Sequence, residues 1–220
     1  MLDDNIVKSI NDYAKRDLPD DHFYNQLFLF ISDNFVRGLI IKEYKNIRFV
    51  YKILEGIQAS DDLLYFEAKT QIIMYASIEE AALSWVLFEY FSNTPKVEGL
   101  LKTSVYKEYC IPPVKKNQIA SALLHDSRDI IPCFKTTINV KKEKVRFDSK
   151  VNAAYKLGII SEKMKNDLID IYEYRNTIHL EAAIKKNLDY TLEMSKKAYR
   201  RVEGLNIELS DSLRKLGLFS

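Results

Sequence analysis

The sequence predicts an all-α protein built as a helical bundle, and two observations lead to this prediction. Its 220 residues include only six Gly and five Pro, so the chain has few signals that interrupt an element. Apolar residues recur at steps of three and four over long stretches, which is the period of a helix packed on one side. A β-sandwich would need many more turns. We therefore expect long helices over most of the chain.

Composition and charge exclude several classes of protein. Hydrophobic residues make up 47% and charged residues 29%, as in an ordinary folded domain. Lys and Arg exceed Asp and Glu by 33 to 31, whereas a strongly cationic nucleic-acid binder would have a larger excess. No apolar stretch approaches the ~18 residues of a membrane span, and the acidic start does not resemble an export signal. These features predict a cytoplasmic protein with no membrane association.

The cysteines predict neither a disulfide framework nor a metal site. Cys110 and Cys133 are the only two cysteines. They do not form a CxxC pair, and no His lies near either of them at the spacing of metal ligands. Cys133 has no local activating base, so we expect it to be buried. Neither a metal nor a cofactor is predicted.

The first 60 residues predict an N-terminal helical extension that packs on the rest of the chain. A short helix is expected over residues 5–16, closed by Asp17-Leu18-Pro19. Helical periodicity then continues over residues 22–58, where Gly38 and Gly56 can interrupt or end a helix. Residues 61–220 are expected to form the main domain.

The most apolar segment predicts a long central helix over residues 63–91, introduced by Ser60-Asp61-Asp62. Its apolar residues occur on every face, so it should be buried nearly all round. Glu79 and Glu80 stand out in this setting, because an unpaired buried carboxylate is expensive. Either one of them faces a cation or a wet cavity, or both lie on a narrow solvated edge.

The middle of the chain gives weaker signals. Pro112-Pro113 marks a loop, and a short helix is expected over residues 118–124. Apolar and polar residues alternate over 134–140, then again over 145–147 after four charged residues. This pattern predicts either one small β-hairpin with a charged turn or an ordered loop.

The last third predicts helices separated by recognisable end signals. A helix that starts at Asp148 or Ser149 should end at Gly158, and Ser161 should cap the next one. A further helix is expected over residues 181–203, ended by Gly204, with a short terminal helix over residues 209–218.

One cluster near the C-terminal end suggests chemistry. In the helix after Ser161, Arg175 occupies the apolar stripe, and His179 follows it four residues later on the same face. A guanidinium and an imidazole side by side could bind a phosphate and move a proton, as metal-independent RNA cleavage requires. The alternative is structural: Arg175 pairs with Glu79 or Glu80, and His179 lies at a helix end.

Two segments resemble the HEPN superfamily. They are Tyr75-Ala76-Ser77-Ile78-Glu79-Glu80-Ala81-Ala82-Leu83, which is similar to its first long helix, and Tyr174-Arg175-Asn176-Thr177-Ile178-His179, which is similar to its Arg-Asn…His signature. The resemblance covers about residues 63–203. It implies a helical bundle that forms a homodimer, with the two Arg-His motifs in a shared cleft.

On that resemblance, Arg175 would hold the scissile phosphate, His179 would act as general acid and base, and Asn176 would orient the substrate. Many HEPN proteins are RNA-cleaving toxins or belong to antiviral and stress-response systems. Three residues separate Arg175 from His179, whereas the catalytic signature has four to six. The shorter spacing favours a member that binds rather than cleaves.

Two groups of basic residues predict an RNA-binding rim beside this cluster. Acidic residues interrupt the second group at helical spacing, so a solvated helix face is the alternative. The residues with which we associate RNA binding are Lys141, Lys142, Lys144, Arg146, Lys185 and Lys186, with Lys135, Lys150, Lys196, Lys197, Arg200 and Arg201 nearby.

The sequence leaves two functional hypotheses. The first is a binding or regulatory module of a bacterial-type stress or defence system, associated with RNA. The second is a metal-independent endoribonuclease of toxin or antiviral type, with a composite Arg/His site at a dimer interface. The partners expected are a second copy of the chain, RNA, and a cognate protein or antitoxin.

Overall fold

The computed structural model describes residues 3–16, 18–122, 124–125, 128–129, 131–177, 181, 184–185 and 189–219. These residues are mostly helical, which confirms the all-α class. The chain divides into two compact units. We call residues 1–92 and 146–220 the helical unit, and residues 93–145 the ribbon unit. The predicted division at residue 60 stays a prediction.

The helical unit begins with α1 (Asp4–Arg16), α2 (Asp21–Leu27) and α3 (Asn34–Gly56). Asp20 and Asp33 cap the second and third helices, because each carboxylate accepts a backbone N–H of the first turn at 2.8 Å. The predicted helix at 5–16 is confirmed. A Cβ on Gly56 would lie 2.8 Å from the ring of Tyr13, so this glycine lets α1 lie close against the end of α3.

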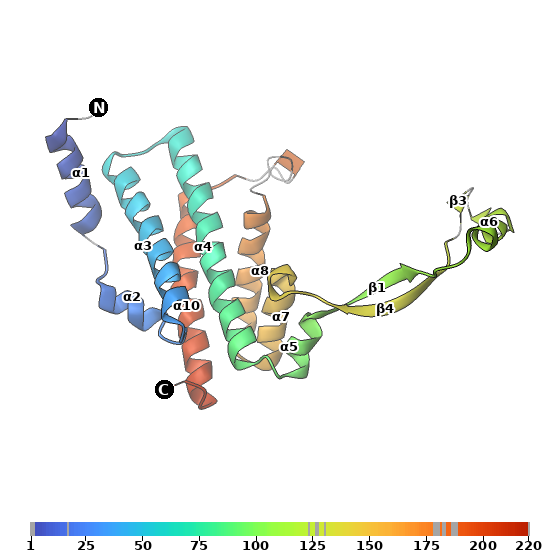
Figure 1. The fold of residues 1–220 in the computed structure, drawn as a ribbon. Coiled ribbons are helices and arrows are strands. Elements are labelled where there is room, and N and C mark those ends of the chain that lie inside the picture. Colours follow the sequence, from blue (N-terminus) through green and yellow to red (C-terminus); the bar gives the residue numbers. More distant parts are fainter. Residues whose placement is uncertain are drawn as a thin grey trace. The chain divides into compact units, whose positions relative to one another are not determined.

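The predicted central helix is α4 (Asp61–Tyr90), which packs against α3, α7, α8 and α10 (Figure 1). Residues on several of its faces are fully buried, including Ala68, Ile72, Ala76 and Leu83. The predicted helix is confirmed, but its burial nearly all round is confirmed only in part, because Leu63, Tyr65 and Phe66 in its first turns are exposed. This position buries Glu79 fully and leaves Glu80 partly exposed.

Aromatic rings join the helices around α4. Tyr44 of α3 stacks on Tyr199 at a centroid distance of 5.8 Å and an interplanar angle of 15°. Tyr44 also meets the ring of Tyr75 edge to face at 6.0 Å. Burial raises the pKa of Tyr44 well above its ordinary range, so its phenol stays neutral inside the bundle.

The C-terminal part supplies α7 (Phe147–Leu157), α8 (Glu162–Asn176) and α10 (Leu192–Lys215). Gly158 closes α7 with a left-handed φ of 75°, as predicted. Ser161 caps α8 by accepting the N–H of Met164 at 3.1 Å.

The prediction of two helices at 181–203 and 209–218 is wrong. One helix, α10, runs without a break through Gly204. Its buried residues Val202, Leu205, Leu209 and Leu213 form one continuous stripe, and the burial of that stripe outweighs the weak helix propensity of a single glycine.

The described residues of the ribbon unit form two short helices and two small antiparallel sheets. Strands β1 (Lys102–Glu108) and β4 (Cys133–Asn139) pair along their whole length and form the larger sheet. The other elements are α5 (Pro95–Leu100), α6 (Pro113–Ala122), β2 (Leu124–His125), β3 (Arg128–Asp129) and the 3₁₀ turn η1 (Lys142–Lys144). The short helix predicted at 118–124 begins earlier, because Pro113 is well suited to the first turn.

The strand predicted at 134–140 is present, but its predicted hairpin partner is wrong. The partner of β4 is β1, from earlier in the chain, and not residues 145–147. Phe147 instead begins α7, where its buried ring lies 4.8 Å from that of Tyr172. Burial in the helical unit therefore overrides the alternating pattern. Cys133 is exposed, contrary to prediction.

Candidate functional site

Glu80 lies at the centre of a three-helix ion network. Its Oε1 is 3.2 Å from Nζ of Lys150 on α7, and its Oε2 is 3.3 Å from Nη2 of Arg175 on α8. The Lys150 side chain is only 4% exposed, so Glu80 is the carboxylate that makes its burial tolerable. This network ties α7 and α8 to the central helix.

Arg175 therefore has a carboxylate partner in the helical unit. Its side chain retains 34% exposure, and its guanidinium lies over the ring of Tyr172 at 5.4 Å. The stripe that predicted its inward position is confirmed at Leu168 and Ile171, which are both buried. The sequence left open whether Arg175 binds a phosphate or pairs with Glu79 or Glu80, and in the structure it pairs with Glu80.

The rest of the Arg-Asn…His cluster is only partly described. Asn176 is the last residue of α8 and is exposed. Thr177 is buried; its hydroxyl donates to the carbonyl of Tyr174 at 2.6 Å and also contacts the hydroxyl of Tyr190. His179 lies outside the described residues. The described site is therefore that of Arg175 and the groups around it.

Glu79, one residue away from Glu80, lies in the opposite environment. It is fully buried, and neither of its carboxylate oxygens has a hydrogen-bond partner among the described residues. Burial raises the pKa of Glu79 to about 8, and the nearby Arg201 only partly offsets this. Glu79 is therefore mostly protonated at neutral pH. The sequence predicted that either Glu79 or Glu80 would face a cation, and the structure shows that it is Glu80.

A cavity of about 390 Å³ lies between α8 and α10 on the side of Arg201. Asp170, Tyr174, Lys197 and Arg201 contribute to its lining. Arg201 is buried, and its Nη2 is 3.9 Å from Oδ1 of Asp167. Nζ of Lys197 lies 3.4 Å from the same oxygen. The lining contains both acidic and basic side chains, so no single sign of charge would select a charged ligand.

The predicted RNA-binding residues occupy different environments. Lys142 and Lys144 in η1 are exposed, as are Lys141 just before it and Lys185. Lys186 lies outside the described residues. In the second basic group, Lys196 pairs with Glu193 at 2.8 Å, as the solvated-face alternative expects.

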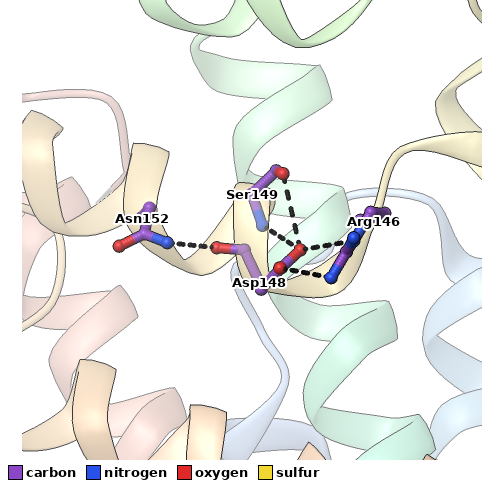
Figure 2. Close-up of polar contacts among 4 residues, drawn as sticks. All are labelled: Arg146, Asp148, Ser149 and Asn152. Carbon is purple, nitrogen blue, oxygen red and sulfur yellow. Dashed lines mark hydrogen bonds and ion pairs between the residues drawn. The ribbon is translucent and has the colours of Figure 1, made fainter.

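Arg146 has a local structural contact. Its Nε and Nη2 donate to the two carboxylate oxygens of Asp148 at 3.2 and 2.8 Å (Figure 2). Asp148 also accepts the backbone N–H of Ser149 at 2.8 Å, and its own carbonyl accepts the Asn152 amide. The Arg146 side chain is still 78% exposed, so it remains reachable while it stabilises the start of α7.

On the β1–β4 ribbon, the sequence reasoning named Lys135 but missed the residues that lie beside it. Two lysines there are paired across the strands with aromatic residues: Tyr106 with Lys135, and Lys107 with Phe134. The alternation in β4 was visible in the sequence. The partner strand was not, because the pairing joins segments that are far apart in the chain.

No protein-family model, curated protein or solved structure matches this chain. Among the helices that the structure describes, none has both the length and the apolar character that a membrane span requires.

Proposed function

We propose that this chain is a HEPN-like module that binds RNA and does not cleave it. The observation that carries the non-catalytic part is the ion pair between Arg175 and Glu80. A scissile phosphate would have to compete for Arg175 with a carboxylate that Lys150 also holds in place. The short spacing between Arg175 and His179 supports the same conclusion.

The RNA part of the proposal is supported by the exposed lysines at η1 and by the resemblance of two helices to the HEPN superfamily. On that resemblance we further propose a cytoplasmic homodimer that acts with a cognate protein partner or antitoxin in a stress or defence system. Its role would be to hold RNA or to regulate that partner.

The endoribonuclease is the second candidate, and one observation favours it. Arg175 keeps a third of its side chain exposed, and its Nη2 lies 3.3 Å from Oε2 of Glu80. Because a guanidinium has five N–H donors, an exposed part of Arg175 could approach a phosphate while the ion pair stays in place.

An end-labelled mixed RNA pool, incubated with the full chain in EDTA, separates the two. The binding module retains RNA on a filter and leaves it intact, and Arg175→Ala and His179→Ala leave the RNA equally intact. The nuclease instead leaves 2′,3′-cyclic phosphate ends, and both variants abolish that cleavage. Glu89→Ala, which removes an exposed carboxylate from the same helix as Glu80, is the control.

A further inference from the structure

The β1–β4 ribbon places one aromatic ring beside one lysine on each of its faces. Residues directly opposite in an antiparallel pair point to the same side, and successive residues point to opposite sides. Tyr106 and Lys135 therefore share one face, while Lys107 and Phe134 share the other. Side chains in such pairs start about 5 Å apart at Cβ.

The rings on this ribbon are open to solvent. Tyr106 is 73% exposed and Phe134 is 39% exposed. Tyr109, 55% exposed, lies 5.1 Å from Phe134 and extends the aromatic surface of that face. Along both strands only Val105 and Thr136 are even half-buried. The ribbon is thus not explained as a layer of a hydrophobic core.

Charge separates the ribbon unit from the rest of the chain. Residues 93–145 contain ten Lys and Arg against five Asp and Glu, a net charge of +5. The residues of the helical unit contain 23 against 26, a net charge of −3. The small net charge of the whole protein therefore conceals a cationic unit, which is complementary to a phosphate backbone.

We infer that the β1–β4 ribbon binds single-stranded RNA, with bases stacked on Tyr106 and on the Phe134–Tyr109 pair and phosphates held by Lys135 and Lys107. A ring next to a cation matches a nucleotide, which has a flat base next to a phosphate. Double-stranded RNA keeps its bases stacked inside the helix, so it offers nothing to the exposed rings. The inference rests on the proposed function because it takes RNA as the ligand.

The test measures binding of a fluorescent single-stranded RNA of about 20 nucleotides. This length exceeds the site that one single-strand-binding domain usually covers. The full chain is compared with the double variants Tyr106→Ala/Phe134→Ala and Lys107→Ala/Lys135→Ala. Phe35 on α3 is also 73% exposed, so Phe35→Ala controls for loss of an exposed ring. Lys163→Ala controls for loss of an exposed lysine on α8.

We expect the ring variant to weaken binding about tenfold or more, because each stacked base contributes substantially. The lysine variant should lower the slope of log affinity against log salt by about 0.7 for each phosphate that the protein no longer neutralises. Both controls should bind as the wild type does, and a duplex of the same sequence should bind more weakly.

The outcomes separate this inference from the proposed function. If the wild type binds RNA and the ring and lysine variants bind equally well, the ribbon inference is overturned while the proposed function stands. If the wild type binds no RNA at all, the proposed function fails. Polyglutamate tests whether the ribbon binds any acidic polymer. If it binds as tightly as RNA does, and the ring variant changes neither affinity, the surface suits an acidic protein and the inference is overturned.

Photocrosslinking keeps the inference testable if a ring substitution disturbs the ribbon. RNA containing 4-thiouridine, crosslinked to the unmodified chain, should attach to peptides that contain Tyr106, Tyr109 or Phe134. Attachment confined to peptides of the helical unit would overturn it.

Discussion

Lysines serve opposite purposes in the two units of this protein. In the helical unit, Lys150 is buried and held by Glu80. In the ribbon unit, Lys135 lies exposed beside an exposed tyrosine. Both lysines belong to the group that the sequence suggested as one RNA-binding rim. The structure separates them, because burial turns a charge into part of the fold whereas exposure leaves it free to attract a ligand.

The difference has a consequence for mutagenesis. Substitutions of charged residues in the interior of the helical unit should change stability, and those on the ribbon should change binding. The expected effects on stability run from the largest, at Glu80, to the smallest, at the exposed lysines of η1.

Glu80→Ala should give the largest loss, because it leaves the buried ammonium of Lys150 without its carboxylate. Removal of one partner of a buried ion pair typically costs about 3–5 kcal/mol of unfolding free energy. Urea denaturation measures this, with Glu89→Ala as the exposed control on the same helix. Equal midpoints for the two variants would show that the network does not stabilise the bundle.

Glu79→Gln should stabilise the protein at pH 8 by several kcal/mol, since each pKa unit between the unfolded and folded values is worth about 1.4 kcal/mol. Burial raises the pKa of Glu79 from 4.5 to about 8. Between these values the folded state keeps a proton that the unfolded state has lost, so the stability of the wild type falls as pH rises.

The glutamine carries no proton to lose, so the advantage of Glu79→Gln should shrink as the pH is lowered toward 4. Thermal unfolding at several pH values measures the difference. A constant difference between the two proteins across this range would contradict the assignment of the pH dependence to Glu79.

Asp148→Ala should cost about 1 kcal/mol, because it removes an acceptor and a negative charge from the first turn of α7. The exposed pair with Arg146 adds little. Asp148→Asn keeps an oxygen that can accept the Ser149 N–H, so its loss should be smaller. Chemical denaturation of the two variants measures this difference, and equal losses would point to the charge alone.

Lys141→Ala/Lys144→Ala should have the smallest effect on stability, within about 0.5 kcal/mol, because both residues are exposed. The same variant should weaken RNA binding severalfold and lower its salt dependence. Denaturation and fluorescence anisotropy on one preparation measure both effects. A loss of stability without a loss of RNA affinity would contradict the view that the charges of the ribbon unit serve binding and not folding.

Features set by local signals were predictable from the sequence. Gly158 and Ser161 mark helix ends through their own backbone and side chain, and the structure places both as expected. The apolar periodicity also predicted the burial of the central helix. For the site, the position of Arg175 on the apolar stripe of α8 predicted that it needs a partner, and the structure supplies Glu80.

Features set by contacts distant in the chain were not predictable. The choice between Glu79 and Glu80 depends on where α7 places Lys150, which no pattern in the sequence gives. The partner of β4 depends on a strand before α6, and the sequence offered a nearer one. The same limit hid the aromatic–lysine pairs of the ribbon, since each pair joins one residue from each strand.

The most direct test of the account is one measurement of RNA binding and RNA integrity in the same tube. The full chain and Tyr106→Ala/Phe134→Ala are titrated in EDTA into end-labelled single-stranded RNA, and the RNA is then recovered and sized. The account predicts that the wild type binds RNA and leaves it intact, and that the ring variant binds about tenfold more weakly or worse. Cleaved RNA, or equal binding by the two proteins, would contradict it.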